Sequence, residues 1–167
     1  ISAYIGNLDL LKSCAKTATI YGYTRPIICE QDVDNDNDDN SAGFIDATDL
    51  RHPIIERLHN NVAYVPNDVV LGRGNGNGIY GMLLFGTNAS GKSSMMKAIG
   101  LNVIMAQCGF FVAATKFVFR PYRHIFSRIN NNDNIFKGES SFAVEMSELR
   151  SILKRATHQS LILGDEL

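Results

Sequence analysis

The sequence predicts an α/β fold in which short strands alternate with helices. Short apolar runs broken by turns continue from Phe44 to the end of the chain. Between them, two longer segments have helical spacing, Ser94 to about Gln107 and Ser141 to about Thr157. A glycine-rich loop precedes the first of these helices, and the last apolar run ends in two acids. Strands interleaved with helices indicate a sheet with helices packed on it.

The N-terminal segment predicts an amphipathic helix that runs to about residue 20. Its apolar side chains recur at helical spacing: Ile1, Tyr4, Ile5, Leu8, Leu11, Ala15 and Ala18. The stretch "YGYTRPIICE" then indicates a turn into an extended segment. It is followed by "QDVDNDNDDN", which has no apolar residue after Val33 and is expected to form a solvated loop. Its spaced acids imitate a calcium loop, but Asp39 replaces the required Gly and Ile45 replaces the bidentate Glu.

Six apolar runs predict strands: "GFIDA", "VAYVPNDVVLG", "IYGMLLFG", "KFVFRP", "HIFSRI" and "SLILG". The stretch "GNGIYG" matches a dinucleotide fingerprint but precedes its strand, so we expect a hairpin or an insertion there. The second helix has one apolar face, made of Phe142, Met146, Leu149, Ile152, Leu153 and Ala156. A modestly basic stretch is interpreted as solvated surface; it contains Lys116, Arg120, Arg123, Arg128 and Lys137.

The strongest chemical signal is "MLLFGTNASGKSSMMKAIG", in which Gly86, Gly91, Lys92 and Ser93 fit the pattern GxxxxGK[ST]. The loop follows an apolar run, Met82 to Phe85, which is expected to be a strand, and it opens a helix. Backbone N–H groups of such a loop face phosphates, and the helix N-terminus adds positive potential. Lys92 would contact the β and γ phosphates, and the Ser93 hydroxyl would bind Mg²⁺. The alternative, a plain glycine turn, explains neither the lysine nor the serine.

The last residues, "SLILGDEL", allow more than one interpretation. A buried strand would deliver Asp165 to the metal and Glu166 to water as a general base. The alternatives are a strand that ends in exposed acids and an endoplasmic-reticulum retention tail. Retention tails begin with Lys or His where this chain has Gly164, and no entry signal is visible. We therefore expect an intracellular protein, whether cytoplasmic, nuclear, organellar or in a viral factory.

Composition excludes several classes of protein. The formal net charge is −1, which argues against a polybasic nucleic-acid arm within this chain. No run approaches the roughly 18 apolar residues of a membrane span. The cysteines Cys14, Cys29 and Cys108 are far apart and form neither a disulfide framework nor a zinc set, so we expect buried free thiols. The chain starts with Ile instead of Met, and both ends are expected to be cuts in a longer protein.

Three segments resemble the ATPase domain of the MutS family of DNA mismatch-repair proteins: "GTNASGKSSMMKAIGLNVIMAQCGFFVAA", "IFSRINNNDNIFKGESSFAVEMSELRSILKRA" and "SLILGDEL". Two pairs of segments upstream also resemble the family. The end of the MutS lever helices is resembled by "LDLLKSCAKTA" with "YTRP". The entry to the ATPase domain is resembled by "LRHPIIE" with "YVPND". Thr87 and Ser90 depart from the usual GPNxGGKST, and Gly164 replaces an apolar residue. With "NNDNIFKG", these variants resemble the divergent branch of large DNA viruses and some organelles.

The resemblance implies a P-loop NTPase of ABC-ATPase type that follows the end of a helical lever domain. Residues 1–25 would close the lever domain, 26–43 would be a connector with the acidic loop, and 44–167 would be an incomplete ATPase domain. Two subunits would sandwich ATP and Mg²⁺. Nucleotide-binding residues would be Tyr64, Gly86, Thr87, Asn88, Ala89, Ser90, Gly91, Lys92, Ser93, Ser94 and, in trans, Ser140. Lys92 and Glu166 would be catalytic, and Ser93 and Asp165 would bind the metal.

Two of these roles have plain alternatives. Tyr64 would stack on adenine, or it is an ordinary strand aromatic. Ser140, in the segment "GESSF", would reach the γ-phosphate bound by the partner subunit, or it is a helix cap. Asn88 would touch the γ-phosphate region.

The resemblance also implies a function. ATP binding and hydrolysis would gate clamping on mismatched double-stranded DNA through regions outside this chain, in a homodimer or a MutS-type heterodimer. The chain alone would hydrolyse ATP poorly. The alternative is a MutS-like scaffold for DNA junctions or recombination that does not recognise mismatches. An SMC-like or transporter ATPase would carry an LSGGQ signature, which the sequence lacks.

Overall fold

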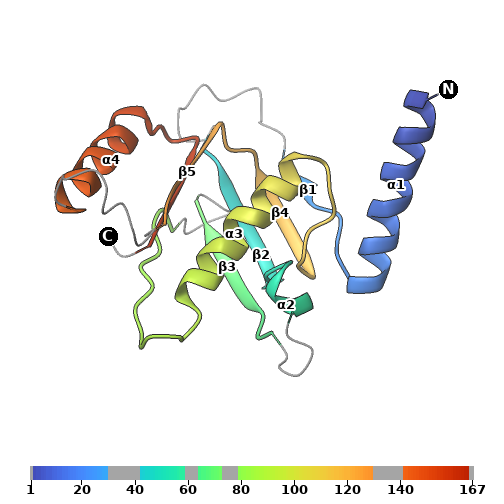
Figure 1. Ribbon diagram of the computed structural model, residues 1–167, viewed down its shortest axis with the longest axis horizontal. Helices are drawn as coiled ribbons and strands as arrows, with labels where there is room; N and C mark the ends of the chain where they lie inside the picture. The colour runs from blue at the N-terminus through green and yellow to red at the C-terminus, as the bar shows by residue number, and fades with distance from the viewer. Residues whose placement is uncertain (1, 30–41, 59–63, 73–78, 130–140, 166–167) are drawn as a thin grey trace.

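A computed structural model describes residues 2–29, 42–58, 64–72, 79–129 and 141–165 of the chain (Figure 1). Its helices are α1 (Ser2–Tyr21), α2 (Ile55–Leu58), α3 (Lys92–Gln107) and α4 (Ser141–Arg155). Its strands are β1 (Ile27–Ile28), β2 (Phe44–Leu50), β3 (Asn67–Leu71), β4 (Lys116–Arg120), β5 (His124–Arg128) and β6 (Ser160–Gly164). The mixed α/β content agrees with the fold class that the sequence predicts.

The strands form two sheets where the sequence suggested one. The larger sheet has the order β1-β4-β2-β3, with β2 antiparallel to both of its neighbours and β1 parallel to β4. Ile45 at its centre is paired with Leu71 on one side and Phe119 on the other. The smaller sheet is the parallel pair β5–β6, whose register places Arg128 opposite Gly164.

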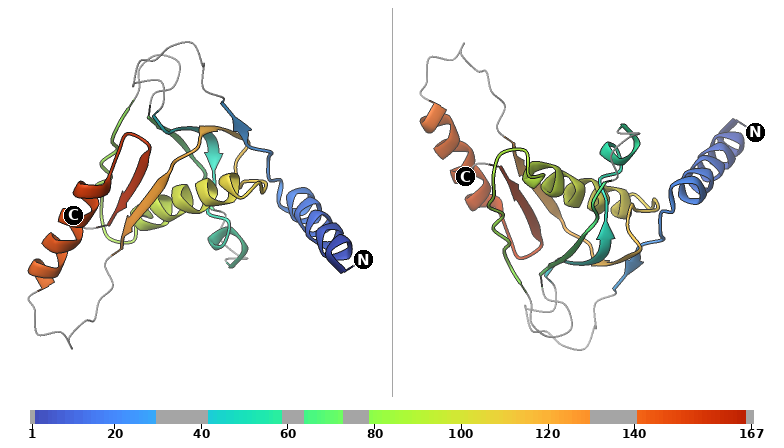
Figure 2. Two further views of the ribbon diagram at one scale, coloured as in Figure 1. Left: turned by 90° about the horizontal axis from the view of Figure 1, so that it is seen from above. Right: turned by 90° about the horizontal axis from the view of Figure 1, so that it is seen from below.

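Helix α3 connects the two sheets through a common core. Figures 1 and 2 show it along one side of the larger sheet, with α1 and α4 at opposite ends of the molecule. Ile99 and Val103 of α3 belong to the same buried cluster as Phe117 of β4 and Leu163 of β6. Burying a side chain of this size contributes roughly 1.5–3 kcal/mol. A β-carbon at Gly100 would lie 2.6 Å from Leu163 Cδ1, so the absence of a side chain there lets β6 pack closely on α3.

Helix α1 is confirmed but stands apart from this core. None of its described residues is buried, and the apolar face that the sequence shows remains exposed, including Tyr4, Ile5, Leu8 and Leu11. Its C-terminal end is attached, since the Arg51 guanidinium donates hydrogen bonds to the carbonyl oxygens of Tyr21 (3.2 Å) and Gly22 (2.9 Å). The helix therefore forms from local spacing and contacts the rest of the molecule at one end.

The prediction of a strand at Met82 to Phe85 is wrong. These residues are outside any strand, and the side chains of Leu83 and Phe85 are 87% and 91% exposed. A strand needs a hydrogen-bonded neighbour, and no strand of the described residues pairs with this segment. Just before it, a bridge between Gly72 and Ile79 is consistent with the expected hairpin, whose residues 73–78 lie outside the described part of the chain.

Three further expectations need correction. The cysteines are free but not buried: Cys108 is exposed, and the other two are partly exposed. The apolar face of α4 is only partly covered, since Leu153 and Met146 are exposed. The basic stretch is not all solvated surface, because Arg128 is buried and Arg120 lies 5.3 Å from the Phe44 ring. Lys137 and the acidic loop lie outside the described residues.

The helices that the structure describes include none that combines the length and hydropathy needed to cross a membrane.

Candidate nucleotide-binding site

The glycine-rich loop forms a tight curl at the N-terminus of α3. Gly91 adopts the left-handed conformation (φ 93°, ψ 7°) immediately before the helix begins at Lys92. Ala89 also has a positive φ, 62°, a conformation that costs a non-glycine residue energy and is concentrated at functional sites. Ser90 N donates to the Thr87 carbonyl, which closes the turn. The loop therefore has the shape that presents backbone N–H groups to an anion.

The Lys92 side chain folds back into this curl. Its amino group donates to the carbonyl oxygens of Gly86 and Thr87, each at 2.8 Å. Lys92 is also the first residue of a 16-residue helix, so its charge and the helix dipole reinforce each other. This combination favours a phosphate at the mouth of the loop.

A cavity of about 810 Å³ lies beside the loop. Its volume is within the roughly 300–1,000 Å³ range of small-molecule sites. Its wall also includes Tyr64 and Asn67, from the segment before β3 and from the start of β3. Predicted site residues that line it are Tyr64, Gly86, Thr87, Ala89, Ser90, Gly91, Lys92 and Ser94. The structure thus brings most of the predicted nucleotide-binding residues together around one space.

Tyr64 is half-buried at this cavity, in the segment that precedes β3 and not in a strand. Burial raises the pKa of its hydroxyl, and the nearby Glu56 carboxylate raises it further. The hydroxyl therefore stays protonated at physiological pH, and Tyr64 contributes an aromatic residue to the wall of the cavity. This placement is compatible with stacking on a nucleobase.

Three described residues of the predicted site do not line this cavity. Asn88, Ser93 and Asp165 are described but are not among the residues that line the cavity. Asp165 directly follows β6, and its N–H donates to the Arg128 carbonyl at 2.9 Å. Ser140 and Glu166 lie outside the described residues.

The donor set suits magnesium bound together with phosphate. Mg²⁺ takes oxygen ligands and is usually held by one or two carboxylates plus substrate phosphates. Ser93 and Asp165 supply one hydroxyl and one carboxylate. Among the described residues there is no group of three or more His, Cys, Asp or Glu side chains placed to hold a metal by themselves. The residue types predicted for the metal are of the kind that Mg²⁺ accepts beside phosphate oxygens.

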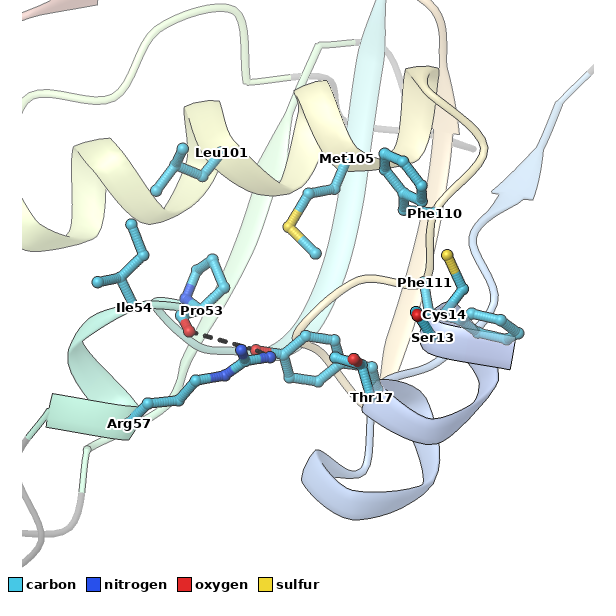
Figure 3. A pocket seen from close by; sticks show the side chains of 11 residues that line it. Ser13, Cys14, Thr17, Pro53, Ile54, Arg57, Leu101, Met105, Phe110 and Phe111 are labelled. Atoms are coloured by element: carbon cyan, nitrogen blue, oxygen red, sulfur yellow. Dashed lines mark hydrogen bonds between the residues drawn. The ribbon is translucent and has the colours of Figure 1, made fainter. Parts of the chain in front are cut away.

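A second cavity, of about 370 Å³, lies between α1, α3 and the segment before α2 (Figure 3). Its wall is largely apolar, with Leu101, Met105, Phe110 and Ile54 among the lining residues. Arg57 stands at its edge, where the guanidinium lies 3.9 Å from the Tyr21 ring centroid. Nothing in this cavity resembles the N–H-rich curl of the phosphate loop.

Polar contacts beside this cavity connect α3 to α1, and sequence reasoning missed them. Asn102 of α3 is fully buried; its amide donates to the Arg51 carbonyl (3.0 Å) and accepts from the Ala113 N–H (2.7 Å). The Arg51 side chain in turn holds the end of α1 and forms an ion pair with Glu56 at 3.0 Å. The one sequence feature that could have indicated these contacts is Asn102, a polar residue within an apolar helical stripe.

Two more side chains complete this junction. The Tyr23 hydroxyl donates to Glu56 at 2.8 Å; burial and this bond raise the pKa of Tyr23 to about 12. His52 is buried, and its Nδ1 accepts from the N–H groups of Ile54 and Ile55, at 3.2 Å each. Burial lowers the pKa of His52, so the ring is neutral and caps the start of α2.

Comparisons with known proteins give the family of the chain. Residues 82–167 match the family model described as MutS domain V. A DNA mismatch repair protein mutS homolog of Acanthamoeba polyphaga mimivirus is 36% identical over the whole chain, which spans 17% of that protein. The mitochondrial DNA mismatch repair protein mutS homolog of Sarcophyton glaucum is 39% identical over 98% of the chain and 16% of that protein. DNA mismatch repair protein MutS of Finegoldia magna is 39% identical over 98% of the chain and 17% of that protein.

The chain thus spans about a sixth of the length of these relatives. A viral and a mitochondrial homologue are among them, as the resemblance to the viral and organellar branch predicts. The family model covers more than half of the chain and includes the glycine-rich loop, α3, α4 and β6. On these grounds the chain belongs to the MutS family, and its residues 82–167 correspond to MutS domain V.

Proposed function

We propose that this chain is the nucleotide-binding part of a MutS-type ATPase that acts in DNA mismatch repair. The proposal depends mainly on the Lys92 amino group. It is held by carbonyl oxygens of the loop at the start of α3, where Gly91 has the left-handed conformation. Lys92 and Tyr64 line the same cavity. A cation, a helix N-terminus and an aromatic wall around one space suit the phosphates and the base of ATP.

Each residue then has a separate task. The loop residues and Lys92 bind phosphate, and Tyr64 stacks on adenine. Ser93 and Asp165 hold Mg²⁺, which neutralises phosphate charge and orients the nucleotide. Glu166 accepts a proton from the attacking water. Asn88 lies by the γ-phosphate, and Ser140 reaches the nucleotide of the partner subunit.

In this proposal the fold is a P-loop NTPase of ABC-ATPase type. Residues 1–25 end a helical lever domain, 26–43 connect it, and 44–167 belong to the ATPase domain. This division is supported by helix α1, none of whose described residues is buried and which stands outside the core. The Asn102–Arg51 contacts join the helix after the glycine-rich loop to the end of α1. A nucleotide-dependent shift of α3 would reach α1 through these contacts.

For the whole protein, we propose that ATP binding and hydrolysis gate clamping on mismatched double-stranded DNA in a homodimer or a MutS-type heterodimer. The support is that each of these relatives is named as a mismatch repair protein or a homologue of one. The rival function, a MutS-like scaffold for DNA junctions or recombination, uses the same ATP site. Binding of the full-length protein to mismatched, matched and branched duplexes would separate the two.

The test of the ATP site compares two lysines of α3. Lys92→Ala should weaken ATP binding by about 10- to 100-fold, the value of a hydrogen bond to a charged group. Lys97→Ala removes an exposed lysine from the same helix and should change ATP affinity less than about 2-fold, as expected for an exposed charge. Equal affinities for both variants in equilibrium ATP titrations would contradict the proposal.

A further inference from the structure

Arg128 ends β5 as a buried cation with two acidic partners on one helix. Its side chain is 5% exposed, Nη2 lies 2.9 Å from Glu145 Oε1, and Nε lies 3.5 Å from Glu148 Oε2. Both acids belong to α4 and are themselves partly exposed. The contacts therefore tie the small sheet to one face of α4.

The same residue holds the main chain of Asp165 from two sides. The Asp165 N–H donates to the Arg128 carbonyl at 2.9 Å, which continues the β5–β6 ladder by one residue. The Arg128 Nη1 donates to the Asp165 carbonyl at 3.4 Å. Backbone and side chain of one arginine thus both contact the residue that carries the proposed metal-binding carboxylate.

Stability alone is a weak reason to place an arginine here. The charge loses water on burial, and replacing a buried ion pair by apolar side chains is often neutral or stabilising. What the arginine adds is geometry, because its planar fork fixes the directions of several donors at once. Here the fork points to α4 on one side and to Asp165 on the other.

We propose that Arg128 is a positioning residue that fixes Asp165 relative to α4; this rests on the proposed ATPase function. Arg128 is not among the residues that line the cavity beside the glycine-rich loop. It sets the direction in which the Asp165 carboxylate leaves the end of β6, and it locks this direction to the helix that begins one residue after Ser140. The end of β6, which carries Asp165, and helix α4 would then move as one unit.

The test is the Mg²⁺ dependence of nucleotide binding by the full-length protein, with a non-hydrolysable ATP analogue as the probe. Glu145→Gln removes the closer of the two charges that hold Arg128 but keeps the size of the side chain. Groups that orient a metal ligand typically account for about 10- to 100-fold in metal affinity. We expect the Mg²⁺ concentration for half-maximal binding to rise by about 10-fold, and affinity without Mg²⁺ to stay within about 2-fold, since only metal-ligand orientation is lost. Glu145→Asp, which keeps the charge, should lie closer to the unmodified protein.

Asp46→Asn is the matched control, because it removes one charge from the Lys116–Asp46 ion pair (2.8 Å) of the larger sheet. It should leave the Mg²⁺ dependence unchanged. If Glu145→Gln lowered the unfolding temperature but left the Mg²⁺ dependence intact, Arg128 would be only structural and the inference would be wrong. If the unmodified protein bound the analogue without any Mg²⁺ dependence, the proposed function itself would fail, and the inference with it.

Discussion

Replacing Asn102 should loosen the contact between α3 and the segment that follows it. The Asn102 side chain makes three hydrogen bonds: it donates to the Arg51 and Ala98 carbonyls and accepts from the Ala113 N–H. Asn102→Ala removes all three. Ala113 is itself fully buried, so its N–H would lose its partner at a place without access to water.

The size of the expected effect follows from the Ala113 N–H, which would lose its acceptor. Leaving a buried polar group unsatisfied costs about 1–3 kcal/mol. Expressed as local opening, the same energy corresponds to roughly 5- to 150-fold faster amide exchange, since 1.4 kcal/mol is tenfold. We expect this acceleration at Ala113 and its neighbours, measured by hydrogen–deuterium exchange. Asn102→Asp keeps an acceptor for the Ala113 N–H but buries a carboxylate against the Arg51 carbonyl, so it should be no milder.

Asn67→Ala provides the control, because the Asn67 amide donates to the Val65 carbonyl at an exposed position (3.2 Å). Water can replace that bond, and exchange in the control should change little. The reasoning would be refuted if Asn102→Ala left the exchange of Ala113 within about 2-fold of its original rate, less than the cost of an orphaned donor allows.

Two other predictions concern the cavity wall and the junction. Tyr64→Ala should weaken ATP binding by about 1 kcal/mol, roughly 5-fold, through lost aromatic contact, while Tyr64→Phe should be nearly silent; equal losses in equilibrium titrations would implicate the hydroxyl instead. The lowered pKa of His52 should make the free energy of unfolding decrease as pH falls below about 6.5, because the unfolded chain takes up the proton first. His52→Asn keeps an acceptor that does not titrate, so this part of the pH dependence should disappear; its persistence in denaturation curves would assign it to another group.

The local features of the fold were predictable because each depends on a short stretch of sequence. Helix α3 begins at Lys92, two residues before the sequence-based estimate, and β6 occupies the expected apolar run. The tight curl of the glycine-rich loop was predictable from its glycines and from the helix that begins directly after it. Eight of the residues predicted to bind nucleotide line the cavity, whereas Asn88 and Ser93 do not. Six further residues line it without having been predicted: Ile55, Val65, Asn67, Leu84, Phe85 and Met95.

The features that depend on distant partners were not predictable. An apolar run such as Met82 to Phe85 forms a strand only beside another strand, and its composition does not reveal whether one is present. The sequence alone predicts a surface position for Arg128, because its partners, Glu145 and Glu148, come close only when α4 lies beside β5. The hydrogen bonds from Arg51 to the end of α1 could not be predicted either, because the two segments are far apart in the sequence.

The most direct test of the proposed ATPase is a comparison of ATP turnover and ATP occupancy in full-length Glu166→Gln. Glutamine keeps the size of the side chain and an oxygen for hydrogen bonding, but it cannot accept a proton. Removing a general base typically slows a reaction by about 10²- to 10⁴-fold. We predict a loss of hydrolysis of that size, with ATP still bound and retained in the protein. Turnover at the unmodified rate with normal ATP occupancy would contradict the hydrolytic role of the acids that follow β6.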